Sequence, residues 1–168
     1  MSVSSRDQRA WWRDAVTYQI YIRSFADGNG DGIGDIEGIR SKLPYLKSLG
    51  VDAIWITPWY PSPQNDHGYD VANYMDIEPM YGTLEDAQRL IDQTHELGMK
   101  LIVDIVPNHF SDQHIWFQEA LKAGRGSKER ARFHFYDANS DGTPPNNWIS
   151  LFGGPSWTQV EDGQFYLH

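Results

Sequence analysis

Residues 101–106 read LIVDIV, a β-branched run of strand length that is apolar except for Asp104 and is followed directly by Pro107. A short apolar run without polar alternation is typical of a strand buried on both faces, as in a parallel sheet. Two earlier runs have a similar character: residues 16–22 read VTYQIYI, and residues 53–56 read AIWI shortly before Pro58. The sequence therefore predicts three strands in this part of the chain.

Helical periodicity fills the two intervals between these runs. Apolar residues recur at three- and four-residue spacing over residues 36–49, with Asp35 placed to cap the helix start and Gly50 to cap its end. A second helix is predicted after the capping-box pattern of Thr83 and Asp86. Its predicted buried face comprises Leu84, Ala87, Leu90, Ile91 and Leu97. Strands that alternate with helices predict an α/β fold of right-handed βαβ units, with active groups at the carboxyl ends of the strands.

The alternation of strands and helices stops after Asn108. A short helix is predicted over residues 115–122, followed by a Gly-, Pro- and Asn-rich stretch at 137–155 and a hairpin about Asp162-Gly163. The chain has 168 residues, which falls short of the roughly 250 residues of a (β/α)8 barrel. We therefore expect the sequence to be a truncated part of a larger fold rather than a complete small domain.

Composition narrows the classes of partner. The net charge of −9 repels polyphosphate, which argues against nucleic acid and anionic membrane surfaces. The chain has no cysteine, and no run resembles a signal peptide or a membrane span. We therefore expect a soluble, cytoplasmic protein.

An acidic loop carries the strongest local chemical signal. Residues 27–35 read DGNGDGIGD, with oxygen-bearing side chains at alternate positions, as in the first half of an EF-hand loop. The position of the final EF-hand ligand is Gly38, and the loop follows a strand, so the chain does not predict an EF-hand. Clustered carboxylates repel one another unless a cation neutralises them, which favours a structural Ca2+ site over a solvated acidic turn. The predicted ligands are Asp27, Asn29, Asp31 and Asp35 with the backbone carbonyl of Ile33.

Two further groups of polar residues follow the second and third strands. Residues 65–70 read NDHGYD and come soon after Trp59 and Tyr60, a mixture that suits a sugar ring but also ordinary turn chemistry. At the end of the third strand, Asp104 is followed by Asn108 and His109. Such positions supply the active sites of α/β proteins, and an imidazole can donate a hydrogen bond to a sugar hydroxyl, although a lone histidine is more often structural.

These motifs together resemble the α-amylase superfamily of glycoside hydrolases, and within it the oligo-1,6-glucosidase and α-glucosidase group. The order and spacing of the motifs agree with that superfamily over essentially all of the chain from Trp11 to His168. The stretches that carry the resemblance are residues 19–25, 27–35, 68–70, 104–109, 145–148 and 152–154.

The resemblance implies a (β/α)8 TIM barrel with a small domain inserted after its third strand. Residues 1–108 would be the N-terminal part of the barrel, with about three βα units, and residues 109–168 would begin an irregular inserted domain. By similarity, Asp66 and Tyr69 would hold the terminal glucosyl unit, His109 would hydrogen-bond the same sugar, and Asp104 would support the site. The loop residues 27–35 would hold Ca2+. The catalytic nucleophile and acid of this superfamily come from later strands, so none is expected in this chain.

The implied activity is retaining hydrolysis, or transfer, of terminal α-glucosyl units from short oligosaccharides. The fragment itself is expected to be inactive, and no protein partner is implied. Trehalose synthase or another α-glucosyl isomerase or transferase shares these motifs and stays open. A non-enzymatic amylase-like scaffold, such as the ectodomain of an amino-acid transporter heavy chain, is disfavoured by the retained Asp66, Tyr69 and His109.

Overall fold

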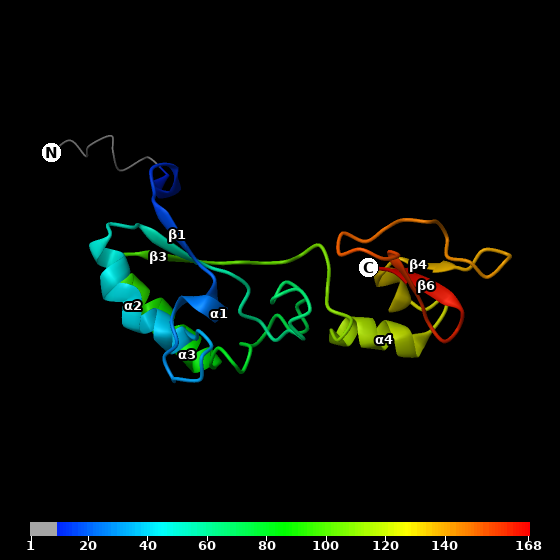
Figure 1. The fold of residues 1–168 in the computed structure, drawn as a ribbon, viewed down its shortest axis with the longest axis horizontal. Coiled ribbons are helices and arrows are strands. Elements are labelled where there is room, and N and C mark those ends of the chain that lie inside the picture. Colours follow the sequence, from blue (N-terminus) through cyan, green and yellow to red (C-terminus); the bar gives the residue numbers. More distant parts are fainter. Residues whose placement is uncertain (1–9) are drawn as a thin grey trace. The chain divides into compact units, whose positions relative to one another are not determined.

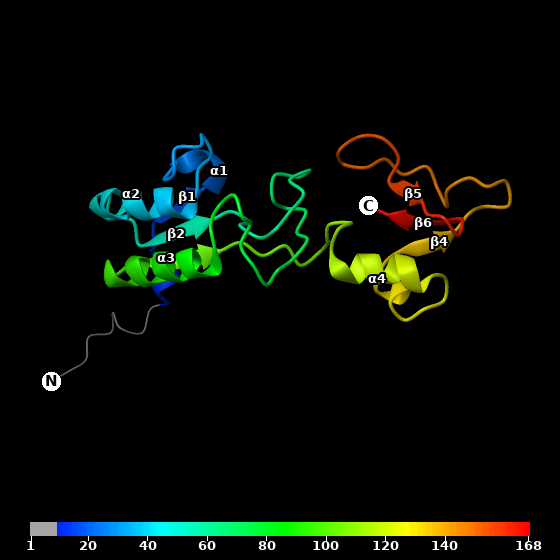
Figure 2. The ribbon, with the colours of Figure 1, turned by 90° about the horizontal axis from the view of Figure 1, so that it is seen from below.

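The computed structural model describes residues 10–168, which form two compact units that divide between His109 and Phe110. The first unit contains a parallel sheet in the order β1-β2-β3, formed by β1 (Thr17–Ile20), β2 (Ala53–Ile56) and β3 (Lys100–Val103). Figure 1 labels β1 and β3, and Figure 2 labels β2. In its register Ile20 lies opposite Ile56, and Ile56 lies opposite Val103. The predicted α/β class is confirmed and all three predicted strands are present, and these strands end together at one edge of the sheet.

The helices of the first unit are η1 (Trp11–Arg13), α1 (Ile22–Phe25), α2 (Ile36–Ser48) and α3 (Leu84–Glu96). The two that were predicted, α2 and α3, begin at their predicted caps. Asp35 caps α2 by accepting from the Gly38 N–H, and the capping box of Thr83 and Asp86 begins α3. The helices α2 and α3 pack against each other (Figure 1), and Arg40 Nε donates to Gln93 Oε1 across their contact at 2.9 Å.

The core of the first unit lies between the sheet and these two helices. Both the strands and the helices contribute fully buried side chains, and so does the long loop between β2 and α3. The largest of these side chains are Tyr81, Ile20, Ile22, Ile36, Ile39, Leu43, Leu46, Ile54, Ile56, Leu90, Met99 and Val71. The apolar periodicity seen in the sequence is therefore the packing face of both helices.

The structure corrects three details. The first strand was predicted over residues 16–22 but spans Thr17–Ile20, and Ile22 begins α1 instead. The third strand was predicted to reach Val106 but ends at Val103, and Ile105 is 67% exposed, because the backbone beyond the ladder has no neighbouring strand among the described residues. Leu84 was predicted on the buried face of α3 but is 57% exposed at its first position. Thr94 is buried in its helix instead, with its hydroxyl bonded to the Leu90 carbonyl at 2.7 Å.

The second unit is built on an antiparallel sheet. Its elements are α4 (Ile115–Ala123), η2 (Arg130–Arg132), β4 (Phe135–Asp137), β5 (Trp157–Gln159) and β6 (Gln164–Leu167). The sheet has the order β4-β6-β5, so β6 lies in the middle (Figure 2). The predicted hairpin is confirmed, with Gly163 at φ +85° in its turn and Val160 N–H bonded to the Gln164 carbonyl. The assignment of residues 109–168 to an inserted domain stays a prediction.

A buried cation organises this second unit. Arg130 is 5% exposed, donates from Nε to the Ala120 carbonyl at 3.1 Å, and pairs through Nη1 with Asp162 at 2.5 Å. Its guanidinium also lies 4.4 Å from the centre of the Phe135 ring. Arg130 therefore ties the carboxyl end of α4 to the β5–β6 turn and to β4.

Among residues 10–168, none of the helices combines the length and the apolar character needed to cross a bilayer. The prediction that residues 1–13 carry no signal-like run concerns in large part residues 1–9, which lie outside the described residues.

Candidate functional site

The candidate site lies where β2 and β3 end, and two segments of chain build it. The first is the loop of residues 57–83 between β2 and α3, which carries Asp66 and Tyr69. The second is the segment of residues 104–109 that leaves β3, which carries Asp104 and His109. Because parallel strands end at the same edge of the sheet, residues far apart in sequence meet here.

Side-chain hydrogen bonds join the two segments. The Tyr69 hydroxyl donates to Asp104 Oδ2 at 3.3 Å, and His109 Nε2 lies 2.9 Å from the Tyr69 carbonyl oxygen. A carbonyl only accepts, so His109 Nε2 carries the proton; Nδ1 then accepts from Asn108 Nδ2 at 2.9 Å. The structure thus brings Tyr69, Asp104 and His109 into one connected group.

Asp66 differs from these residues because its carboxylate makes no hydrogen bond within residues 10–168. Its backbone carbonyl accepts the Tyr69 N–H at 3.0 Å, which places the two residues in one turn. The residue is also half-buried. A carboxylate in this condition is available to accept hydrogen bonds from a polyhydroxyl ligand.

The backbone around Asp66 is held in an unusual conformation. Gln64 and His67 have φ values of +62° and +52°, in the left-handed region that residues other than glycine rarely adopt. Asp70 closes the loop, since its carboxylate accepts from Ser62 Oγ at 2.6 Å and from the Asn65 N–H at 2.8 Å. Such strain persists only where the surrounding structure fixes it, and it is common at binding sites.

The local environment acts on the site tyrosine. Burial, followed by the nearby charge of Asp104, raises the pKa of Tyr69 above its ordinary value. The phenol therefore stays protonated and donates to the carboxylate at any physiological pH.

Two tyrosines outside the predicted set of site residues contact the second segment. The Tyr60 hydroxyl donates to the Asp104 carbonyl at 3.1 Å, and the Tyr74 hydroxyl contacts the carbonyls of Val106 and His109. Tyr60 was noted only as an aromatic neighbour, and Tyr74 lies in a loop without a distinctive motif. No sequence signal distinguishes them, because their bonds go to backbone atoms about 30 or more residues away.

The acidic loop 27–35 has a different internal structure. Asp27 accepts from the N–H groups of Gly30 at 2.6 Å and Gly32 at 2.8 Å, and Asp31 accepts from Ile33 N–H at 2.8 Å. The N–H groups of Gly32 and Gly30 hold the pKa of Asp27 below its ordinary value, which keeps this carboxylate ionised.

Asp35 is separated from the other carboxylates of the loop by its role as a helix cap. It is 4% exposed and accepts from the N–H groups of Gly28 and Gly38. Within residues 10–168 no three His, Cys, Asp or Glu side chains gather closely enough to hold a metal ion. The exposed oxygens of Asp27, Asn29 and Asp31 suit a hard cation, whereas Asp35 is buried and already accepts two backbone N–H groups.

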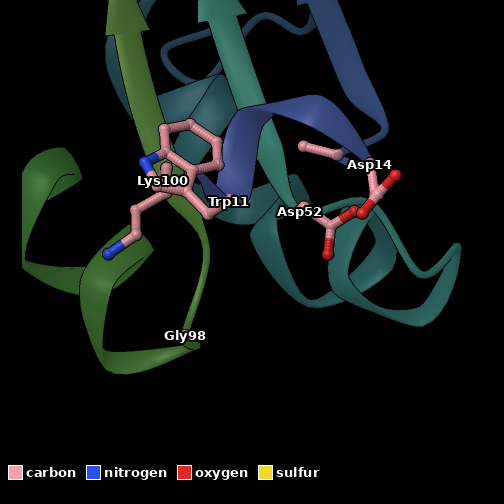
Figure 3. Close-up of a pocket in the computed structure, with 6 residues that line it drawn as sticks. Trp11, Asp14, Asp52, Gly98 and Lys100 are labelled. Atoms are coloured by element: carbon pink, nitrogen blue, oxygen red, sulfur yellow. The ribbon is translucent and has the colours of Figure 1, made fainter. Parts of the chain in front are cut away.

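A separate cavity of about 280 Å3 lies near the opposite, amino ends of the strands (Figure 3). Its lining includes Trp11, Asp52 and Lys100, and Asp52 also accepts the Val16 N–H at 2.9 Å. None of the predicted site residues lines this cavity. It therefore does not contribute to the candidate site.

Comparison with known proteins identifies relatives that are named α-glucosidase and oligo-1,6-glucosidase. The chain is 52% identical over 167 residues to a probable α-glucosidase of Rhizobium meliloti, covering 95% of this chain and 29% of that protein. It is 54% identical to an oligo-1,6-glucosidase of Heyndrickxia coagulans, covering 94% of this chain and 28% of the relative. The chain thus spans less than a third of the length of these relatives.

A solved structure agrees with the fold. The isomaltulose synthase of Protaminobacter rubrum superposes with a TM-score of 0.91 at 49% identity, covering 95% of this chain and 28% of that protein. The sheet of β1, β2 and β3 corresponds to the N-terminal part of the TIM barrel in such structures. Residues 19–168 match the family described as alpha amylase, catalytic domain, and the chain therefore belongs to the α-amylase catalytic-domain family.

Proposed function

We propose that the whole protein, of which this chain is a part, is a retaining glycoside hydrolase that removes terminal α-glucosyl units from short oligosaccharides. The observation that carries the proposal is the linked group of Tyr69, Asp104 and His109 beside the unpartnered carboxylate of Asp66. Relatives about half identical to this chain are named α-glucosidase and oligo-1,6-glucosidase.

Each residue has a distinct proposed role. Asp66 accepts hydrogen bonds from the hydroxyls of the glucosyl unit, and the Tyr69 ring stacks on its C–H face. Asp104 supports Tyr69 through the hydrogen bond at 3.3 Å. His109 donates to a sugar hydroxyl, for which its Nε2–H must exchange the Tyr69 carbonyl for the ligand.

The bond-breaking groups are proposed to come from other parts of the whole protein. A retaining glycosidase needs a nucleophilic carboxylate and a carboxylic acid about 5 to 5.5 Å apart. Asp66 and Asp104 are assigned to binding and support, so they do not form this pair. We expect the 168-residue chain alone to show no hydrolysis.

Kinetics of the whole protein tests this function. With p-nitrophenyl α-D-glucoside, Asp66→Asn is expected to lower kcat/KM by about tenfold to a hundredfold, as expected for loss of charge-assisted hydrogen bonds. Asp92→Asn, at an exposed position of α3, is the matched control and should leave kcat/KM unchanged. Absence of glucosidase activity in the wild-type protein, or an unaffected Asp66→Asn variant, would overturn the proposal.

Isomerisation or transfer of an α-glucosyl unit is a second candidate, favoured by the match to an isomaltulose synthase. The described residues are compatible with both reactions, because a hydrolase and an isomerase both bind the terminal glucosyl unit before water or another sugar hydroxyl accepts it. Chromatography of the products from sucrose, maltose and isomaltose separates the two: free glucose indicates hydrolysis, whereas a rearranged disaccharide indicates isomerisation.

We also propose Ca2+ as a structural ion of the acidic loop, bound by Asp27, Asn29, Asp31, the Ile33 carbonyl and Asp35. Support comes from the oxygen donors at alternate positions of the loop. A bound cation would neutralise the repulsion among these carboxylates.

We further propose that the whole protein is cytoplasmic. The absence of cysteine from this chain supports that location, because the cytosol keeps thiols reduced and its proteins rarely depend on disulfides.

A further inference from the structure

The segment of residues 104–109 carries Asp104, Asn108 and His109 without the support of a sheet. The parallel ladder makes its last hydrogen bond from the Asp104 N–H to the Ile56 carbonyl at 3.1 Å. Beyond that bond the segment has no helix or strand, and Pro107 has no N–H to donate. Its conformation therefore depends on contacts other than a ladder.

Two tyrosine hydroxyls supply those contacts. Tyr60 donates to the carbonyl of Asp104 at 3.1 Å, and Tyr74 lies within hydrogen-bond distance of the carbonyls of Val106 and, at 3.1 Å, His109. A phenol has one hydrogen, so Tyr74 shares it between its two acceptors. Three carbonyls within six residues are thus bound by this pair of hydroxyls, which we call the tyrosine clamp (Tyr60 and Tyr74).

The two members of the tyrosine clamp also support each other. Their ring centres are 5.5 Å apart at an interplanar angle of 49°, and Tyr60 packs against the core of the unit. Burial is the main cause that raises the pKa of both phenols, so both remain hydrogen-bond donors. The contact between the rings and their partial burial therefore restrict the orientation of both phenols.

The tyrosine clamp lies in the same loop as two of the predicted sugar-binding residues. Both tyrosines belong to the loop of residues 57–83, which also carries Asp66 and Tyr69. We propose that Tyr60 and Tyr74 are positioning residues that hold the backbone of residues 104–109 in register with this loop, so that Asp104 and His109 meet Tyr69 and the sugar. The role in sugar binding rests on the proposed function.

The arrangement of bonds supports this assignment. The side-chain bonds of the site, from Tyr69 to Asp104 and from His109 to Tyr69, join the same two segments. Both depend on where the backbone places Asp104 and His109, and that backbone is bound by the tyrosine clamp at its first and last residues. A displacement of about 1 Å in such a site can lower a rate about a hundredfold.

Phenylalanine variants separate positioning from packing, because they keep the ring and remove the hydroxyl. In the whole protein we expect Tyr74→Phe to lower kcat/KM for p-nitrophenyl α-D-glucoside about tenfold and to raise the inhibition constant of D-glucose to a similar extent. Tyr60→Phe should act in the same direction. Tyr45→Phe is the matched control: Tyr45 is 55% exposed on α2, and both constants should be unchanged.

A spectroscopic measurement tests the tyrosine clamp independently of activity. In two-dimensional 1H–15N spectra of histidine rings, His109 of the wild-type protein should show the Nε2–H form, with its signals assigned by the His109→Gln variant. Tyr74→Phe should shift these signals towards the average of the two neutral forms, and Tyr45→Phe should not.

The two readouts distinguish the possible failures. If the wild-type protein lacks glucosidase activity but Tyr74→Phe alters the His109 signals, the proposed function fails and the tyrosine clamp stands. If the His109 signals and the glucose inhibition constant are the same in Tyr74→Phe and wild type, the tyrosine clamp is wrong whatever the activity.

Discussion

The Asp35 carboxylate accepts a hydrogen bond from the backbone N–H of Gly38 at 2.6 Å, which joins the end of the acidic loop to the first turn of α2. At Gly38 the backbone also approaches the Ala26 carbonyl so closely that an added Cβ atom would lie 1.9 Å from its oxygen. The start of α2 is therefore fixed by a contact of backbone against backbone.

Gly38→Ala is expected to destabilise the first unit by about 2 to 3 kcal/mol, because the overlap with the Ala26 carbonyl forces the backbone apart. Gly50→Ala, just beyond the other end of α2, is the matched control. Gly50 has φ +79° with nothing within 4 Å of an added Cβ, so strain alone should cost about 1 kcal/mol. Urea unfolding measures both, and equal effects would contradict the backbone contact.

Calcium should raise the thermal unfolding midpoint of the whole protein if the acidic loop binds it. The expected stabilisation is about 2.7 kcal/mol at a free concentration one hundred times the dissociation constant, and EDTA should reverse it. Asp31→Ala removes one predicted ligand and should abolish most of the shift, whereas Asp92→Ala on α3 should retain it. No calcium-dependent shift in the wild-type protein would remove the proposed site.

Arg130→Met should destabilise the second unit by about 3 to 5 kcal/mol, because it leaves Asp162 and the carbonyls at the end of α4 without their partner. Partial desolvation raises the pKa of Asp162, but the Gln164 N–H and Arg130 outweigh it and hold that pKa below its ordinary value. Hydrogen exchange of residues 110–168 measures the loss. Lys128→Met, at a side chain 88% exposed, should stay within about 0.5 kcal/mol of wild type.

The second unit should also lose stability in mild acid through His114. This buried residue caps α4, since its Nδ1 accepts the Trp116 N–H at 3.2 Å, and it packs against the rings of Phe110 and Trp116. Burial lowers the pKa of His114 from 6.5, against a smaller opposing effect of Glu119. Once protonated, the imidazole has no nitrogen that can accept the Trp116 N–H, and its positive charge is repelled by the positive, amino-terminal end of the helix dipole.

The direction of the pH effect follows from this lowered pKa. The unfolded chain binds the proton more readily than the folded one, so the contribution of His114 is complete above pH 6.5 and is lost as the pH falls through the folded-state pKa. His114→Asn keeps a cap that does not titrate, and it should reduce the slope of unfolding free energy against pH below 6.5. Equal slopes in the two proteins would refute this effect.

Local signals in the sequence predict the elements well. The Asp35 cap, the Thr83 and Asp86 capping box and the strand at residues 53–56 all lie where the sequence places them, because caps and apolar periodicity act within a few residues. The short strand β4 and the single turn α1 are absent from the prediction, since neither has a periodic pattern of its own.

Burial and strand length are predicted less well where they depend on residues that are distant in the sequence. Leu84 belongs to the apolar pattern of α3 but is exposed in the first turn of that helix. The predicted strand at residues 101–106 ends at Val103 in the structure. Both outcomes depend on which other elements are present to cover a side chain or continue a ladder. A pattern within one segment does not contain that information.

For the candidate site, the sequence by itself determined which chemical groups are present and that Asp66, Tyr69, Asp104 and His109 follow strands that end together. Their functional roles stay predictions. Only the tertiary structure decided which of them touch: Tyr69 reaches Asp104 across 35 positions, and the Tyr74 hydroxyl reaches the His109 carbonyl across another 35. The physical reason is that a hydrogen bond needs its atoms within about 3 Å, and over such separations only the path of the folded backbone sets that distance.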